Sequence, residues 1–221
     1  MQTSVEHSQN IRQEIIKFCR LLYDKNLLAS ADGNVSYRIS DKEILITPSG
    51  VPKIFLQPED ICVIDLDGNI ISGKPSSERL MHLQVYKSCP QAKAVVHAHP
   101  PYPVAWSIAY PDDKELPSSC LAEVILGTGR IPIVPYARPS TQNMGDQLLP
   151  FLPKCRVMIL ARHGGLTWGE SLREAWMGME RLDHAALMLY LADTMNGLSH
   201  LPDEEINVLK EMRKKIGPRT L

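Results

Sequence analysis

The sequence of 221 residues has no excess of charge, no long apolar run and no paired cysteines. Lys and Arg number 24 against 25 Asp and Glu, for a formal net charge of -1, so we expect neither nucleic acid nor an anionic membrane surface as a partner. No apolar run approaches the roughly 20 residues that span a bilayer, and the N-terminal MQTSVEHSQN lacks the basic-then-apolar order of a signal peptide. The expected location is the cytoplasm.

The cysteines argue against a disulfide framework and against a thiolate metal site. They are odd in number, widely spread and never in a C-x-x-C pair: Cys19, Cys62, Cys89, Cys120 and Cys155. A reducing compartment fits this usage best. The chain is long enough to bury a substantial core, and we find no repeat, low-complexity stretch or linker. We therefore expect a single domain over residues 1–221.

The chain begins with a helical pattern and continues with strands. Ile11, Ile15, Phe18 and Leu22 recur at intervals of four, three and four, which predicts an amphipathic helix over about residues 6–28. Short β-branched runs separated by turn residues then predict strands and hairpins in GNVSYRIS, EILITPSG and ICVIDLDGNIIS. In the last of these, Asp67-Gly68 is expected to supply the positive φ angles of a tight hairpin.

Helices and strands alternate along the rest of the chain. KPSSERLMHLQVYKS and PYPVAWSIAY predict helices, whereas AKAVVHAH, IPIVPY and RVMILARHGGLTW are strand-like. The clearest helix starts at a capping box, Ser171 to Glu174, and ends at Asn196-Gly197. A charged helix, LPDEEINVLKEMRKKIG, follows it. This order predicts an α/β protein in which helices cover a mixed or antiparallel sheet.

Two histidines stand one residue apart in AVVHAHPPY. On a strand, His97 and His99 project to the same side, and converging imidazoles suit zinc at about 2.0–2.1 Å. The alternative is a chance pair of hydrogen-bonded polar residues at a strand end. His163 in RHGG offers a third ligand, because it ends another apolar run and two glycines let the backbone pass close to a bound group. The other histidines are interpreted as surface or packing residues: His7, His82, His184 and His200.

A carboxylate and several small polar residues accompany these histidines. Glu78 follows Ser76-Ser77 at the start of a predicted helix, for which either serine can be the N-cap. Glu78 is then either a functional carboxylate or a first-turn acid stabilised by the helix dipole. GNVS, TPSG and Ser76-Ser77 offer hydroxyl and backbone N–H groups that together could cradle a phosphate, although each alone is more typical of a plain turn.

Taken in order, GNVS, ITPSG, KPSSE, HAHPPY, IPIVPY and RHGG resemble the class II aldolase/adducin family, especially its fuculose-phosphate aldolase type. The resemblance runs from about Ile11 to Leu209. It depends on an ordered set of motifs: PSSE, then H-x-H about 18 residues later, then a distant H-G. It implies a single three-layer α/β/α domain with a largely antiparallel central sheet. It also implies a homotetramer with active sites at subunit boundaries.

The resemblance further implies a metal site and a reaction. His97, His99 and His163 are similar to zinc ligands, with Mn²⁺ or Co²⁺ as other candidate ions, and Glu78 to the catalytic carboxylate and a candidate fourth ligand. The residues expected to hold a substrate phosphate are Asn34, Ser49, Gly50, Ser76 and Ser77. The implied reaction is reversible cleavage of a small ketose or sugar phosphate to dihydroxyacetone phosphate and an aldehyde, through a metal-stabilised enediolate.

One position departs from the family. Fuculose-phosphate aldolase has a tyrosine upstream of its equivalent of IPIVPY that donates a proton to the aldehyde half, and the matching position here is Leu121. Glu123, two residues on, is either an alternative acid or an ordinary charged residue. Tyr136, Arg138 and Trp106 flank the site motifs and are candidates for the pocket or for packing.

Three relatives and one non-enzyme are the alternatives. Sugar-acid phosphate decarboxylases and methylthioribulose-phosphate dehydratase use a similar site, and so does a pentulose-phosphate epimerase, which has an aspartate at the position of Glu78. An adducin-like interaction module resembles the enzymes but has lost the metal histidines. Because His97, His99 and His163 are present, we expect an enzyme, a metal-dependent carbon–carbon lyase.

Overall fold

One eight-stranded sheet organises the chain in the computed structural model, which describes residues 4–220. The strand order is β4-β3-β2-β1-β5-β8-β7-β6, and every neighbouring pair is antiparallel except β6 and β7. The strands are β1 Asn34–Arg38, β2 Glu43–Ile46, β3 Cys62–Asp65, β4 Ile70–Ser72, β5 Ala94–Ala98, β6 Ile133–Val134, β7 Val157–Leu160 and β8 Gly164–Gly169. The predicted, largely antiparallel sheet is confirmed.

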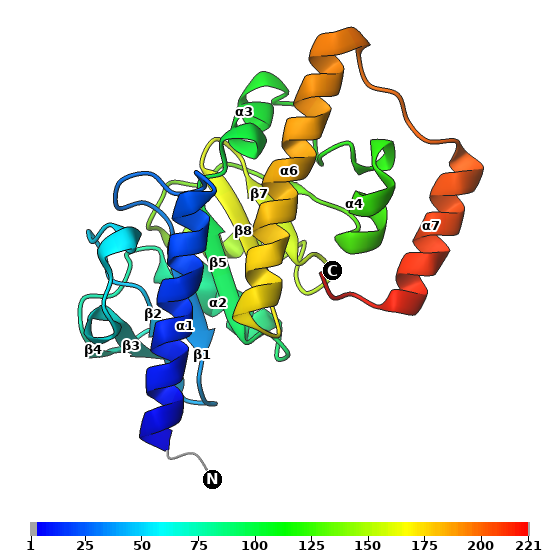
Figure 1. Ribbon diagram of the computed structural model, residues 1–221. Coiled ribbons are helices and arrows are strands. Elements are labelled where there is room, and N and C mark those ends of the chain that lie inside the picture. Colours follow the sequence, from blue (N-terminus) through cyan, green and yellow to red (C-terminus); the bar gives the residue numbers. More distant parts are fainter. Residues whose placement is uncertain (1–3, 221) are drawn as a thin grey trace.

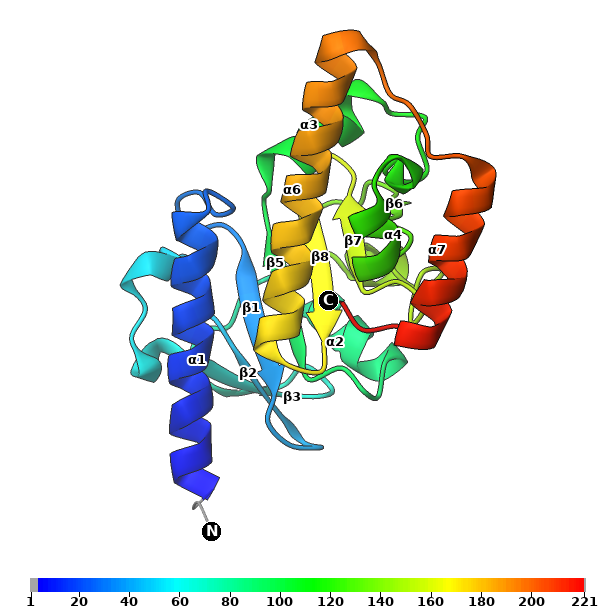
Figure 2. The same ribbon diagram turned by 45° about the vertical axis from the view of Figure 1, so that its right-hand side comes forward.

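Helices cover both faces of this sheet (Figure 1). Helices α1 (Ser4–Asp24) and α6 (Leu172–Asn196) cross one face, with α3 (Pro101–Ala109) packed against α6. Helices α2 (Arg79–Ser88) and α5 (Gln142–Asp146) pack together on the opposite face. Helix α4 (Ala122–Gly127) packs against α7 (Asp203–Ile216), which stands apart from the sheet in Figure 2. Among residues 4–220, no helix combines the length and apolar character needed to cross a membrane.

Two apolar cores fill the spaces between the sheet and its helices. Strand alternation explains them, because Val96 of β5 belongs to the core under α1 and α6 whereas Val95 belongs to the core under α2. The predicted stripe of α1 lies in the first core, with Ile15 and Leu22 fully buried. His97 and His99 follow the alternation of Val95, so both histidines are directed to the side of the sheet that α2 covers.

Several predicted boundaries need correction. The first helix ends at Asp24, and neither Ser76 nor Ser77 caps α2, because Glu78 itself is the N-cap residue and no side chain caps the helix. Of the predicted turn, only Gly68 has a positive φ, since residues 66–69 form a four-residue loop between β3 and β4. RVMILARHGGLTW is two antiparallel strands, β7 and β8, joined by a turn that contains His163. The predicted N-cap of α6 is confirmed, since Ser171 Oγ accepts a hydrogen bond from Glu174 N at 3.1 Å.

Candidate functional site

His97 lies at the centre of the sheet and is fully buried. Its Nδ1 is 2.9 Å from the carbonyl oxygen of Gly165 on β8. A carbonyl can only accept a hydrogen bond, so Nδ1 carries the proton and donates it. Its Nε2 therefore faces the other two histidines and Glu78. An outer hydrogen bond of this kind fixes both the tautomer and the ring orientation of a metal-binding histidine.

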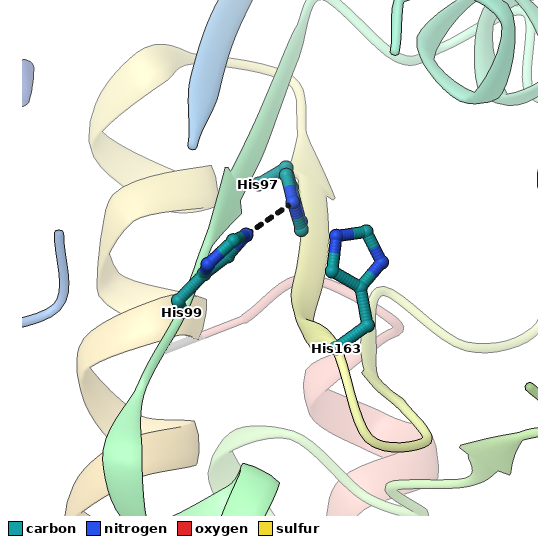
Figure 3. Close-up of side chains that lie close together, drawn as sticks. All are labelled: His97, His99 and His163. Atoms are coloured by element: carbon teal, nitrogen blue, oxygen red, sulfur yellow. Dashed lines mark hydrogen bonds between the residues drawn. The ribbon is translucent and has the colours of Figure 1, made fainter. Parts of the chain in front are cut away.

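The other two histidines reach the same point from outside regular strands. His99 directly follows the end of β5, and its Nε2 lies 3.0 Å from Nε2 of His97. Its Nδ1 faces Asp32 Oδ2 at 3.6 Å. His163 comes from the turn between β7 and β8, where Arg162 has a positive φ and its backbone N–H donates to Ser107 Oγ at 2.8 Å. The structure thus brings together all three histidines that the sequence indicated, as Figure 3 shows.

The geometry of the three rings fits a metal ion. One nitrogen from each histidine lies within 4.8 Å of the others, and the ring centroids are 4.8–5.1 Å apart. Nitrogens around a tetrahedral zinc ion, each about 2.0–2.1 Å from it, are about 3.3 Å from one another. Burial, followed by the neighbouring His97 and His163, lowers the pKa of His99 to about 3. His99 is therefore neutral at physiological pH, the form that binds a metal.

Glu78 extends this cluster from the N-terminus of α2. Its Oε1 lies 3.1 Å from His163 Nε2, and its Oε2 lies 3.3 Å from His97 Nε2. Burial alone raises the pKa of the Glu78 carboxyl, but hydrogen bonds and charge from His163 and His97 outweigh it, so the net pKa is well below its ordinary value. An ionised carboxylate thus stands beside three imidazoles, where it can accept a proton or supply a further ligand.

The predicted phosphate loops lie side by side next to Glu78. Ser49 N donates to the carbonyl of Lys74 at 3.0 Å, and Ser76 N donates to the carbonyl of Thr47 at 3.1 Å. Gly50 is exposed at a positive φ, Ser76 is buried and Ser77 is exposed. The two turns therefore form one polar surface, although Ser49 and Lys74 are 25 residues apart in the sequence.

Asn34 is placed differently from the other candidate phosphate ligands. It is 2% exposed, and its Nδ2 donates to Glu78 Oε2 at 2.9 Å. Its position follows from strand register, because Asn34 on β1 pairs with His97 on β5. The contact that the structure gives Asn34 is therefore with the carboxylate.

A buried lysine behind the loops was not predicted from the sequence. Lys53 is 2% exposed, and its Nζ donates to the carbonyls of Ala31 at 2.7 Å and Val51 at 3.0 Å. Burial lowers the pKa of Lys53, while the charges of Cys19, Asp32 and Glu78 oppose that effect. Lys53 joins the loop before β1 to the loop after β2. Its only local signal was its place directly after TPSGVP.

His82 is a packing residue rather than a surface residue, but its polar contacts were not predicted from the sequence. It is fully buried on α2 and hydrogen-bonded on both ring nitrogens, to Asn34 Oδ1 and Ser36 Oγ. A usable signal was present in the sequence. Glu78 and His82 are four residues apart, the spacing that places two side chains on one face of a helix.

The remaining candidates lie as follows. Leu121 is half-buried at the start of α4 and packs against the core, and Glu123 is exposed on the same helix. Trp106 is buried, with its indole N–H donated to Asp113 at 3.0 Å. Tyr136 is 58% exposed. The backbone carbonyl of Glu123 accepts a hydrogen bond from Arg181 at 3.2 Å.

Comparison with known proteins gives consistent relatives. The family described as Class II Aldolase and Adducin N-terminal domain matches residues 13–190. The chain is 38% identical to L-fuculose phosphate aldolase of Methanococcus vannielii over 81% of this chain and 95% of that protein. It is 32% identical to 3-oxo-tetronate 4-phosphate decarboxylase of Escherichia coli K12, over 83% and 87% of the two chains.

A solved structure supports the same family assignment as the sequence relatives. YgbL of Escherichia coli, a suggested aldolase/epimerase/decarboxylase, superposes with a TM-score of 0.86 at 30% identity, covering 92% of this chain and 99% of that one. Residues 13–190, which the family model matches, include all eight strands, the three histidines and Glu78. The chain therefore belongs to the class II aldolase and adducin family.

Proposed function

We propose that the protein is a zinc-dependent class II aldolase. It would cleave a small ketose phosphate reversibly to dihydroxyacetone phosphate and an aldehyde. The observation that carries the proposal is the convergence of His97, His99 and His163 beside the ionised carboxylate of Glu78. The similarity to L-fuculose phosphate aldolases, at 38% identity, favours this reaction.

The three imidazoles would hold the metal, which would supply Lewis-acid stabilisation of the negative charge that develops on the substrate oxygens. Zinc fits three nitrogen ligands with an open position, and Mn²⁺ or Co²⁺ fits the same donors. His97 keeps its ring fixed through Gly165, and His99 is neutral at physiological pH. The ring of His97 is therefore already oriented, and His99 can bind a metal without loss of a proton.

Glu78 would transfer a proton to and from a carbon atom of the substrate. In the direction of synthesis it removes a proton from the hydroxymethyl carbon of dihydroxyacetone phosphate, and in cleavage it returns a proton to that carbon. Its lowered pKa keeps the carboxylate ionised at neutral pH, which is the state that accepts a proton. Glu78 is also the residue that would supply a fourth ligand when no substrate is bound.

The turns at 47–50 and 74–77 would hold the phosphate. Ser49, Gly50, Ser76 and Ser77 bring hydroxyl and amide groups together next to Glu78, and buried Lys53 adds positive charge behind them. Binding the unreactive end of the substrate there fixes its carbons against the carboxylate and the imidazoles. Asn34 remains a proposed phosphate ligand, and its Nδ2 also donates to Glu78 Oε2.

The test combines metal content with product formation. Purified protein is analysed for zinc and assayed with several ketose 1-phosphates, and dihydroxyacetone phosphate is detected by coupled reduction. We expect about one zinc per chain, and we expect His97→Ala to lose zinc and turnover while keeping its fold. The matched control is His7→Ala, because His7 is an exposed histidine on α1. A metal-free wild type that stays inert after zinc is added would reject the proposal.

A decarboxylase is the second candidate. Relatives named 3-oxo-tetronate 4-phosphate decarboxylase share 32% identity with this chain, and Leu121, at the position of the family's proton-donating tyrosine, has no ionisable group. Decarboxylation would use the same metal ligands but has no aldehyde half that must receive a proton. Release of carbon dioxide from a phosphorylated 3-oxo sugar acid, without aldehyde formation from ketose phosphates, would select this reaction. An epimerase would return the substrate carbon skeleton intact, and a dehydratase would release only water.

Two further properties belong to the proposal. The protein would act in the cytoplasm as a homotetramer whose active sites lie at subunit boundaries, as the resemblance implies. Several apolar side chains on α6 are exposed, among them Met195 at 80%, and are suited to contact with another copy. Light scattering of the purified chain measures the assembly.

A further inference from the structure

A chain of five buried or half-buried side chains leads away from Glu78 into the core. Glu78, His82 and Tyr86 are spaced four residues apart along one face of the segment that begins α2. Asn34 and Ser36 are spaced two apart on β1 and share the face of the sheet that this helix covers. Asn34, Ser36, His82 and Tyr86 are each no more than 2% exposed.

The contacts between these residues are continuous. Asn34 Nδ2 lies 2.9 Å from Glu78 Oε2, and Asn34 Oδ1 lies 2.5 Å from His82 Nε2. On the other side of the imidazole, His82 Nδ1 lies 2.7 Å from Ser36 Oγ, which is 2.8 Å from the hydroxyl of Tyr86. Every polar atom named here has a partner.

The direction of each hydrogen bond follows from the amide of Asn34. Its Nδ2 donates to Glu78 Oε2, and its carbonyl oxygen faces His82 Nε2. That oxygen can only accept, so His82 carries its proton on Nε2. Complete burial lowers the pKa of His82 to about 3, which keeps the ring neutral. Its Nδ1 therefore has a lone pair and accepts from Ser36.

The same logic reaches the end of the chain. The single hydroxyl proton of Ser36 is donated to His82, so Ser36 Oγ accepts the proton of Tyr86. All four donors thus point towards Glu78. An asparagine amide has no intrinsic preference for which end faces a given neighbour. Here the Nε2–H of His82 stabilises the orientation that places the amide N–H against the carboxylate.

We propose that His82 is a positioning residue, which holds the amide of Asn34 in the single orientation that fixes Oε2 of Glu78 beside the metal-binding histidines. The expected effect of His82 on turnover rests on the proposed function. The tautomer of His82 does not, since it can be observed without any substrate. Ser36 supports the tautomer, and Tyr86 supports Ser36. Outer-shell partners of this kind typically change activity by about 10- to 100-fold when removed.

The tautomer is tested first, by spectroscopy. Protein labelled with ¹⁵N-histidine is studied near pH 7 with long-range ¹H–¹⁵N correlation, and the His82 signals are assigned by their loss in His82→Gln. We expect a protonated Nε2 and an unprotonated Nδ1, with the same result in Tyr86→Phe, because Ser36 keeps its own donor. A signal from Nδ1–H, or from an imidazolium, would overturn the proposal whatever the enzyme catalyses.

The effect on turnover is tested with two substitutions at one position. His82→Leu leaves Asn34 Oδ1 without a donor and should lower kcat about tenfold or more, with KM and zinc affinity changed less than about threefold. His82→Gln can donate an amide proton to Asn34 and should restore most of kcat. His7→Gln, at an exposed histidine, is the matched control.

Ser36→Ala gives an independent readout if His82→Leu does not fold. It removes the donor to Nδ1, so we expect a mixture of His82 tautomers and a kcat between those of the wild type and His82→Leu. A wild-type kcat in His82→Leu, or an unchanged tautomer and kcat in Ser36→Ala, would overturn the proposal. If the wild type converts none of the candidate substrates, the proposed function fails, while the spectroscopic result still decides the tautomer.

Discussion

Two adjacent glycines of β8 allow a test of how tightly the geometry of the proposed metal site is constrained. Gly164 and Gly165 point to opposite faces of the strand. A Cβ at Gly164 would lie 2.4 Å from the carbonyl oxygen of Ala98, 2.8 Å from Cε1 of His97 and 3.1 Å from Cδ2 of His99. A Cβ at Gly165 would meet only flexible side chains of α6, with Leu182 nearest at 2.8 Å.

The magnitudes follow from these distances. Ordinary van der Waals contact begins at 3.4 Å, and the Ala98 carbonyl oxygen would lie 2.4 Å from the new Cβ. Gly164→Ala therefore requires the β5 backbone to move away by about 1 Å, and the two imidazoles to move with it. Metal–ligand distances tolerate about 0.2 Å. We therefore expect zinc affinity to fall at least 10- to 100-fold, or about 1.4–2.8 kcal/mol. Overpacking should cost each variant about 1–3 kcal/mol of unfolding free energy, so stability alone does not distinguish them.

Zinc affinity and stability are both measured for Gly164→Ala and for Gly165→Ala. Zinc affinity is obtained by competition with a chromophoric chelator, and stability of the metal-free proteins is obtained from urea titration. Gly164→Ala should bind zinc weakly, whereas Gly165→Ala should bind it within about threefold of the wild type while losing comparable stability. Folded Gly164→Ala with wild-type zinc affinity would refute the claim that this strand positions the histidines.

Three further predictions concern Glu78, the buried arginine and acid stability. Glu78→Gln should lower kcat by about 10²- to 10⁴-fold, and steady-state kinetics within threefold of the wild type would remove its role as base. Arg156 is 3% exposed and pairs with Glu174 at 2.7 Å. Arg156→Leu should lower the free energy of unfolding by about 3–5 kcal/mol, because it leaves that buried carboxylate without a positively charged partner. Arg219→Leu, which removes an exposed ion pair, should cost less than about 1 kcal/mol, and equal losses would contradict this account. The unfolded state binds a proton on His82 below about pH 6.5, but the folded state does so only near its pKa of about 3, so stability falls as pH falls. The metal-free wild type should lose about 2 kcal/mol more than His82→Gln between pH 7 and pH 5, and identical losses in urea titrations would show that His82 is protonated in the fold.

The features that were predictable from the sequence depend on local spacing. His97 and His99 share a face because side chains alternate along a strand, and the capping serine of α6 lies three residues before the glutamate whose N–H it accepts. The strand order adjacent to the site was not predictable in this way. His163 was recognisable by its flanking residues, yet its position in a turn depends on the pairing of β7 with β8.

The features that could not be predicted involve partners distant in the chain. Glu174 satisfied the capping motif by sequence, but its carboxylate accepts from Arg156 and from the backbone of Thr220. Asn34 was predicted to bind a phosphate, but the contact of its amide with Glu78 depends on β1–β5 register and could not be predicted. Lys53 had no periodic signal for burial. Local periodicity specifies the direction in which a side chain points. Strand register and packing determine which residues it contacts.

The placement of the three imidazoles has a consequence for the lifetime of the protein in the cell. They join the central strand β5 to the turn before β8, so an ion held there clamps the middle of the sheet rather than its rim. Unfolding would then require release of that ion, which at a free concentration 100 times Kd adds about 2.7 kcal/mol. Scarcity of the metal would weaken the scaffold and the chemistry together, and turnover of the chain would follow the supply of the ion.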